Sequence, residues 1–222
     1  MEREPSQRGL GLSRAMAQDC LVDAFTADPE APSMEMETDP IARAATADEA
    51  YSLALARMCR ASQWTIGHVF VSAGGSGDLV SSQVWHIARP AAHDPVRLVE
   101  LRAVTETIRV APGQGLAGRA MITHAPTWAS DVAEYPSYAR PGVAWETGIR
   151  GAAAFPVVDE RRVLAVVELF SDAVIEMDLA THKLGVATAG ALAERLALGP
   201  LFEEASAFAQ IAAETSDLPS AP

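Results

Sequence analysis

Two long apolar runs dominate the pattern of hydrophobic and polar positions along this chain. They cover residues 151–158 and 163–170, and only charged residues, 159–162, separate them. Two strand-length apolar runs joined by a short charged segment predict an antiparallel hairpin. Neither run alternates between apolar and polar positions, which predicts strands covered on both faces of their sheet. We therefore expect helices on both sides of a central sheet.

The spacing of apolar residues predicts the remaining elements. Helical spacing predicts a first helix over 42–61 and a long last helix over 177–198, which Gly199 and Pro200 end. The further expected strands are 64–72, 79–88, 106–110 and 127–130, and the expected short helices are 96–104 and 116–123. Strands and helices in this order predict an α+β fold with one mostly antiparallel sheet.

The two ends of the chain differ in charge from its middle. Residues 1–40 carry nine acidic and three basic side chains, and residues 200–222 carry four acidic side chains and no basic one. Most of the formal charge of −12 therefore lies outside the expected fold. We expect an acidic, disordered or partly helical extension over 1–41, a folded domain over 42–199, and an acidic tail over 200–222 with room for a short helix.

Composition excludes several functional classes. The chain has no basic patch of the kind that binds nucleic acid. It has no run of about 18 apolar residues that would span a membrane, and its charged first residues do not form a signal peptide. With only two cysteines and no export signal, we expect reduced thiols and a cytoplasmic location.

A glycine motif follows the expected strand 106–110. Gly113, Gly115 and Gly118 form G-x-G-x-x-G, and Asp131 lies further on, as in a dinucleotide-binding fingerprint. The helix that follows is too short for a normal parallel crossover, and a hairpin comes after it. The alternative interpretation, a tight turn that lets the short helix pack on the sheet, is the one we favour.

Six short motifs occur in a familiar order. They are W-x-x-G-H-V at 64–69, an isolated tryptophan at Trp85, A-P-G-Q-G-L-A-G-R-A at 111–120, P-T-W-x-x-D-V at 126–132, G-I-R-G-A-A-A-F-P-V at 148–157 and V-x-E-L-F-S at 166–171. Together they resemble a GAF domain, and most of all the sensory GAF domains of bacterial histidine kinases and cyclase-type signalling proteins. The resemblance covers about residues 45–198.

This resemblance implies a GAF/PAS-like fold with a six-stranded antiparallel sheet. The first and last helices would pack on one face and form a homodimer through 42–61 and 177–198. Short helices and loops on the other face would enclose a pocket for a small molecule.

The candidate pocket residues are mostly aromatic. An apolar pocket lined by such side chains suits a small ligand, although each of them also suits a plain core. The expected set is Trp85, Trp128, Asp131, Tyr138, Trp145, Phe155 and Glu168. Glu168 lies on a strand face with Val166 and Phe170, where a carboxylate needs a partner. That partner is either a ligand or an arginine such as Arg119 or Arg150. The segment 134–146, rich in aromatic residues and prolines, is the expected lid.

Cofactor signals are weak. No histidines are spaced as a metal-binding pair, but some GAF domains bind haem through one histidine, for which His86 and His124 are candidates. Cys20 and Cys59 lie outside the region where family members attach bilin, so no covalent chromophore is expected. The chain has no asparagine, so the N-K…F…D-E motif of cyclic-nucleotide GAF domains is absent. The cysteines of GAF-type methionine sulfoxide reductases are also missing.

Three functional hypotheses follow. The first is a non-enzymatic sensory or regulatory domain that binds a small molecule and signals through its terminal helices to a partner in trans, since kinase, cyclase and DNA-binding modules have no room in this chain. The second is an interaction module without a ligand, and a haem sensor is a variant of the first. The third, an enzyme, has no nucleophile–base pair or metal cluster to support it.

Overall fold

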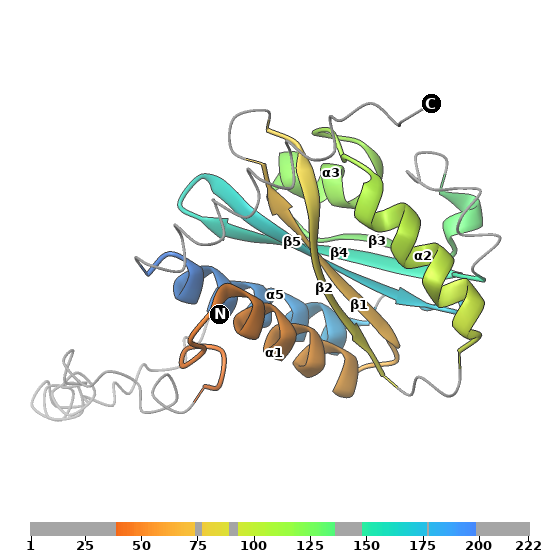
Figure 1. Ribbon diagram of the computed structural model, residues 1–222, viewed down its shortest axis with the longest axis horizontal. Helices are drawn as coiled ribbons and strands as arrows, with labels where there is room; N and C mark the ends of the chain where they lie inside the picture. Colours follow the sequence, from red (N-terminus) through yellow and green to blue (C-terminus); the bar gives the residue numbers. More distant parts are fainter. Residues whose placement is uncertain (1–38, 74–76, 89–92, 136–147, 177, 199–222) are drawn as a thin grey trace, which may run out of the picture. The chain divides into compact units, whose positions relative to one another are not determined.

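A five-stranded antiparallel sheet forms the centre of the fold (Figure 1). The computed structural model describes residues 39–73, 77–88, 93–135, 148–176 and 178–198. The strands are β1 (Ile66–Ser72), β2 (Leu79–Ile87), β3 (Thr127–Ala129), β4 (Gly151–Asp159) and β5 (Arg162–Ser171), in the spatial order β2-β1-β5-β4-β3. The helices are α1 (Ala47–Arg60), α2 (Pro95–Thr107), α3 (Gly115–Thr123) and α5 (Leu179–Leu196), with a 3₁₀ turn, η2 (Val132–Glu134).

The predicted hairpin is confirmed. β4 and β5 pair antiparallel from Gly151 and Ser171 to Asp159 and Arg162, and Glu160 turns the chain with a φ of 52°. Both strands are buried along nearly their whole length, because helices cover both faces of the sheet. The absence of alternation in the two apolar runs follows from this double cover.

Different helices cover the two faces. One hydrophobic cluster joins the face that carries Val69, Phe155 and Val167 to α1 and α5. The other cluster joins the face that carries Phe70 and Ala154 to α2 and α3. Figure 1 shows α1 and α5 side by side on one side of the sheet, with α2 and α3 on the other. We call these the α1/α5 face and the α2/α3 face.

Side-chain caps set where the helices begin. Thr46 Oγ1 accepts a hydrogen bond from Glu49 N at 3.2 Å, so α1 starts at Ala47 and not at residue 42 as predicted. Asp178 caps α5 through Thr181 N at 2.7 Å, and Asp94 caps α2 through Val96 N at 2.9 Å. Each cap satisfies a backbone donor that the first turn of a helix leaves without a partner.

The predicted strand at 106–110 is wrong, and the described sheet has five strands, not six. The helix α2 runs on to Thr107, whose Oγ1 donates to Ala103 O at 3.0 Å. Beyond the helix, only Val110 reaches the sheet, where it forms an isolated bridge with Leu79. The alternation of polar and apolar residues over 107–110 resembles that of a strand, but Thr107 still belongs to α2.

The glycine motif forms a tight turn. Gly113 has a φ of +81° and its N–H donates to Gly118 O at 2.8 Å. A Cβ on Gly118 would lie 2.3 Å from Ala111 O, so only glycine fits there. All strand pairs in the described part of the chain are antiparallel, so the motif is not part of the parallel βαβ unit that a dinucleotide fold requires.

Candidate functional site

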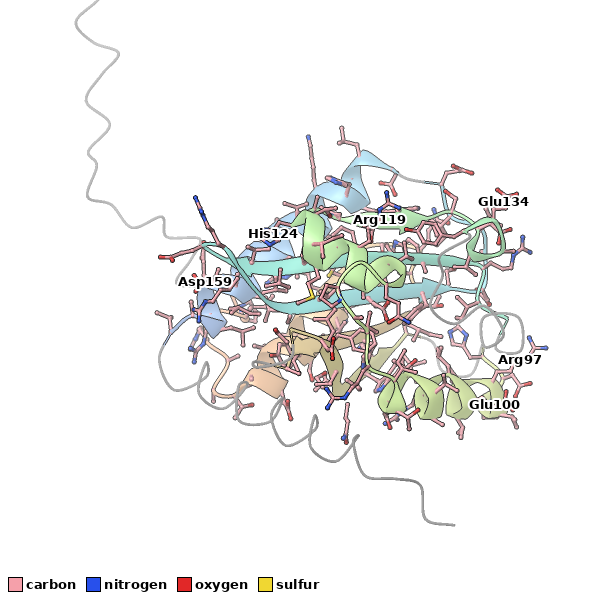
Figure 2. The ribbon with its side chains drawn as sticks, turned by 90° about the horizontal axis from the view of Figure 1, so that it is seen from above. Arg97, Glu100, Arg119, His124, Glu134 and Asp159 are labelled. Atoms are coloured by element: carbon pink, nitrogen blue, oxygen red, sulfur yellow. The ribbon has the colours of Figure 1, made fainter. Side chains whose placement is uncertain are left out.

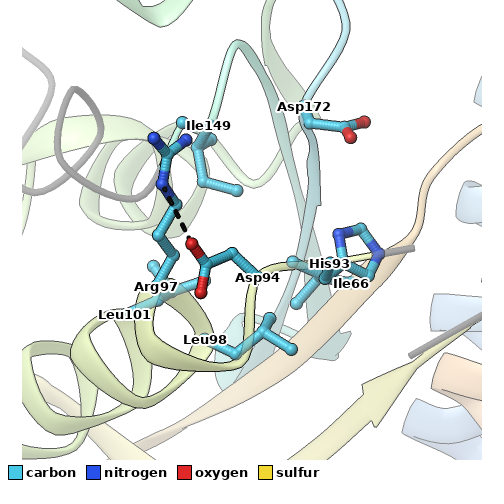
Figure 3. A pocket seen from close by; sticks show the side chains of 9 residues that line it. Ile66, His93, Asp94, Arg97, Leu98, Leu101, Ile149 and Asp172 are labelled. Atoms are coloured by element: carbon cyan, nitrogen blue, oxygen red, sulfur yellow. Dashed lines mark ion pairs between the residues drawn. The ribbon is translucent and has the colours of Figure 1, made fainter. Parts of the chain in front are cut away.

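A cavity of about 150 Å³ lies under the start of α2 on the α2/α3 face. Figure 3 shows it between α2, the start of β1 and the loop that follows β5. Its lining residues are Ile66, His93, Asp94, Arg97, Leu98, Leu101, Gly148, Ile149 and Asp172. We call it the α2 cavity.

The α2 cavity combines an apolar floor with a charged rim. On the rim, Arg97 Nε lies 3.9 Å from Asp94 Oδ2, and both side chains are about half exposed. The ring of His93 adds a buried Nε2 that has no hydrogen-bond partner. Asp172 stands apart from the Arg97–Asp94 pair, on the other side of the cavity (Figure 3). Convergent polar groups over an apolar floor are typical of a site for a small molecule.

Gly148 leaves room at the rim for the guanidinium of Arg97. Gly148 has a φ of +73°, and a Cβ placed on it would lie 2.6 Å from Arg97 Nη1. Any side chain at position 148 would therefore displace Arg97. An apolar cavity of roughly 150 Å³ holds a molecule of about the size of benzene, so the α2 cavity suits a small ligand with a short apolar body and a charged group.

Deeper along the same face, Glu168 lies beside a buried histidine. In the register of β1 and β5, Glu168 is directly opposite His68, and both side chains are buried. His68 Nε2 lies 2.8 Å from Ser81 Oγ, and its ring contacts the rings of Phe70 and Trp85. His68, Ser81 and Glu168 are thus buried polar residues on the α2/α3 face.

The arginines suggested as partners of Glu168 are placed elsewhere. Arg150 bonds to Asp131, and Arg119 is exposed on α3. The expected ion pair of Glu168 with either of them is therefore wrong.

Trp85 ties β2 to the second half of α2. Its Nε1 donates to Glu106 Oε1 at 2.9 Å, and Arg102 bonds to the same carboxylate oxygen at 3.2 Å. The guanidinium of Arg102 lies 5.8 Å from the centre of the Trp85 ring, within the range of a cation–π contact. Of the candidate pocket residues, Trp85 and Glu168 thus share the α2/α3 face with the cavity, although neither lines it.

Trp128 and Phe155 lie on the opposite face. Trp128 Nε1 donates to Ile175 O at 2.9 Å, and its ring packs edge-on against Trp64 with centroids 5.1 Å apart. Phe155 is fully buried against Gly185 of α5. The candidate residues therefore do not form a single site.

Asp131 is partly buried and caps η2 through Ala133 N at 3.0 Å. The hydrogen bond from Arg150 lowers the pKa of its carboxyl group. Tyr138, Trp145 and most of the expected lid 134–146 lie outside the described residues, so their role as a lid stays a prediction.

A second hollow lies on the α1/α5 side of the sheet. Its volume is about 210 Å³, and it is mostly apolar. It is lined by His124, Pro126, Phe155, Pro156, Val158, Val186, Ala189 and Gly190, so it runs between β4, α5 and the end of α3. We call it the α5 groove.

The remaining candidates for cofactor chemistry are scattered. His86 lies on β2. Its pKa is lowered mainly by burial and, to a smaller extent, by the nearby positive charge of Arg60. His124 ends α3 just before β3, and β2 and β3 are opposite edges of the sheet, so the two histidines lie on different sides of the fold. Burial raises the pKa of the Cys59 thiol to about 12. In the part of the chain that the structure describes, no three His, Cys, Asp or Glu side chains are grouped to hold a metal, and no helix is long and apolar enough to cross a bilayer.

Sequence analysis missed the cavity residues on α2. The expected helix 96–104 begins one residue late, although Asp94 followed by Pro95 is a recognisable helix start. The expected helix 96–104 already contained Arg97, Leu98 and Leu101, so only its start and its role as a cavity wall were missed. Nothing in the sequence shows that Asp172 and Gly148 meet them.

The fold and the cavity define a class of protein, an α+β domain whose sheet carries its first and last helices on one face and a small cavity under short helices on the other. The family model described as "GAF domain" matches residues 44–193, and the chain belongs to this family.

Solved GAF-type structures share the fold at low sequence identity. The GAF domain of a phosphoenolpyruvate-protein phosphotransferase from Coxiella burnetii is 18% identical, with a TM-score of 0.56 over 78% of this chain and 99% of that one. The free methionine-R-sulfoxide reductase of Neisseria meningitidis, solved with its substrate, is 16% identical, with a TM-score of 0.54 over 75% and 83%. A domain of a putative two-component sensor histidine kinase from Sinorhizobium meliloti 1021 is 15% identical, with a TM-score of 0.50 over 68% and 90%.

These similarities concern the fold alone. The neighbours include both signalling domains and an enzyme. Comparison with curated protein sequences finds no match.

Proposed function

We propose that this chain is a non-enzymatic sensory or regulatory GAF domain that binds a small molecule in the α2 cavity. The observation that supports the proposal is the cavity itself, with Arg97 and the unpartnered His93 Nε2 set over the apolar floor of Ile66 and Leu101. Such a site selects a small ligand by one charged group and a short apolar part.

The signal would leave through α1 and α5, which form a homodimer and act on a partner protein. β1 and β5 connect the two faces, because Ile66 borders the cavity while Val69 and Val167 pack under α1 and α5. A ligand that moves α2 against β1 therefore acts on strands that also support the terminal helices. Such coupling requires that the ligand binds the two arrangements with different affinity.

Two variants of the full chain test the site. We expect a thermal-shift and calorimetric screen of amino acids, small carboxylates, nucleotides and haem to find a ligand whose affinity falls at least about tenfold in Arg97→Ala, since a charge-assisted hydrogen bond contributes roughly 1.5–3 kcal/mol. Arg119→Ala removes the same charge from α3, away from the cavity (Figure 2), and should bind like the unchanged protein.

Either of two outcomes would contradict the proposal. One is a screen in which no compound shifts the melting temperature. The other is a ligand that loses affinity equally in both variants, which would place its site elsewhere. An absorption spectrum of the purified protein tests the haem alternative directly, because bound haem absorbs in the visible range.

Catalysis is the second candidate, favoured by the fold similarity to the reductase from Neisseria meningitidis. The chemistry of the described cysteine argues against it. Cys59 is buried, and its raised pKa keeps it as the unreactive thiol at neutral pH. An assay of the purified chain with free methionine sulfoxide and a thiol reductant tests this candidate. Turnover would establish it and overturn the non-enzymatic part of our proposal.

A further inference from the structure

The outward face of α5 carries one narrow line of exposed residues. They are Leu179, Ala180, Lys183, Ala187, Gly190, Glu194, Ala197 and Leu198, the last two of which follow the end of the helix. At 100° per residue, these positions fall within a stripe about 100° wide. The two leucines are 68% and 61% exposed. We call this line the α5 stripe.

The α5 stripe is complementary to a second copy of itself that runs in the opposite direction. Read from either end, it runs leucine, alanine, charged, small, small, charged, alanine, leucine. The two charged residues, Lys183 and Glu194, have opposite signs. If a second α5 is laid antiparallel, Leu179 faces Leu198 of the partner subunit and Lys183 faces Glu194 of the partner subunit. A contact of a surface patch with itself about a two-fold axis has this symmetry.

We propose that the α5 stripe is the surface through which two copies of this chain dimerise, antiparallel about an axis between Thr188 and Ala189. The inference rests on the dimer of the proposed function and specifies its contact. Lys183 is the only lysine of the chain, and the pair that it makes with Glu194 occurs twice in the dimer. Complementary charges of this kind fix orientation and register more than they add affinity.

A glycine near the axis has no use within one subunit. A Cβ on Gly190 would meet nothing within 4 Å, so packing inside the subunit does not require glycine there. Glycine in a helix interior is also less favourable than alanine. In the antiparallel dimer, Gly190 faces Ala187 of the partner subunit, and these two small residues let the helix axes approach closely.

The α5 groove extends the same surface. Gly190 belongs to both the stripe and the groove, and Val186, which is 46% exposed, lies beside it. A second helix laid on the stripe therefore also covers the edge of an apolar hollow. An exposed apolar surface of this kind marks an interaction site more often than a plain surface.

Charge reversal in the full chain tests the register. Sedimentation equilibrium should show a dimer whose dissociation constant rises at least about tenfold in Lys183→Glu and in Glu194→Lys, because each change sets like charges opposite each other. The double variant exchanges the two charges and should restore the affinity. Glu100→Lys makes the same change on the exposed side of α2 and should have no effect.

Cross-linking tests the antiparallel arrangement. In a Cys20→Ser background, chains that carry Leu179→Cys and chains that carry Leu198→Cys should form disulfide dimers when mixed, and neither should do so alone. Gly190→Leu should fold, since the monomer leaves space at that position, and should be monomeric.

The outcomes separate this inference from the function on which it rests. A dimer that is indifferent to both charge reversals, or that cross-links Leu179→Cys chains to each other, overturns the antiparallel contact and leaves a dimer through other surfaces. A monomer at all concentrations overturns both the contact and the dimer of the proposed function. Neither result affects ligand binding in the α2 cavity, which the Arg97→Ala variant tests separately.

Discussion

Asp39 is the first described residue, and it fastens the segment before α1 to that helix. Arg57 Nη1 donates to Asp39 Oδ2 at 3.0 Å, and Asp39 Oδ1 accepts from Ile41 N at 2.9 Å. The hydrogen bond with Arg57 is the main cause of the lowered pKa of Asp39. A carboxyl group whose pKa is lowered by folding stabilises the fold above its unfolded pKa, and this contribution is lost as the pH falls through its folded pKa.

The first prediction concerns this carboxylate. Asp39→Asn should lower the free energy of unfolding by about 0.5–1 kcal/mol at pH 7, as expected for a partly exposed ion pair. The difference should shrink as the pH falls below about 4, the unfolded pKa of aspartate, because the unchanged protein then loses its charge as well. Urea denaturation at pH 7 and pH 3 measures both values. Glu100→Gln on α2 is the control, and a difference that stays constant with pH would contradict the assignment.

At the scale of single residues, the sequence could predict burial but not the face of the sheet. Ala154 and Phe155 are neighbours in an unbroken apolar run, yet they belong to different hydrophobic clusters. In a strand that alternates, polarity reveals the outer face, but in β4 both faces are covered and this signal is absent. For this reason Phe155 and Trp128 were grouped with Trp85, from which the sheet separates them.

At the scale of elements, the error at 106–110 arose from a local pattern that tertiary contacts override. Residues 107–110 alternate polar and apolar, which is typical of a strand. In the fold, Glu106 stays helical because Arg102, four residues earlier, and Trp85 of β2 both bond to its carboxylate. The partner on β2 is distant in sequence, so this preference could not be predicted locally.

The packing of α5 on β4 depends on one glycine, which gives a second prediction. A Cβ on Gly185 would lie 2.2 Å from Phe155 Cε1, whereas one on Gly190 of the same helix would meet nothing within 4 Å. Gly185→Ala should therefore lower the free energy of unfolding by about 1–3 kcal/mol, as overpacking does. Gly190→Ala should leave it unchanged or raise it by up to about 1 kcal/mol through helix propensity.

Denaturation of both alanine variants at concentrations where the monomer dominates provides the comparison. Equal effects of the two substitutions on the free energy of unfolding would show that helix propensity, and not contact with Phe155, determines the cost of alanine at position 185.

For the whole molecule, both hydrophobic clusters lie between Ile41 and Leu196. We expect a fragment of residues 37–199 to unfold cooperatively at the same temperature as the full chain, which would support the predicted domain over 42–199. The few residues before α1 still matter, because Ile41 is fully buried and Ala44 O accepts from Arg195 Nε at 2.9 Å.

A fragment of residues 47–199 is the matched test of that claim. It keeps every described helix and strand but lacks Ile41 together with the Thr46 cap and the contacts of Asp39 and Ala44, and it should be less stable by at least about 2–5 kcal/mol, the usual cost of removing a buried isoleucine side chain alone. Thermal melting followed by circular dichroism measures both fragments. If the two melt together, the segment before α1 does not belong to the domain.

The order of the strands in the sheet has a consequence for how the chain acquires its shape during synthesis. β1 lies between β2 and β5, and Ile66 pairs with Phe170, more than a hundred residues later. While the ribosome is still extending the chain, β1 can pair only with β2, and one edge of that hairpin stays without its neighbour. An unpaired edge on a nascent chain is a place where other chains attach. We therefore expect the interval between the emergence of β1 and that of β5 to be when the nascent chain is most prone to aggregate.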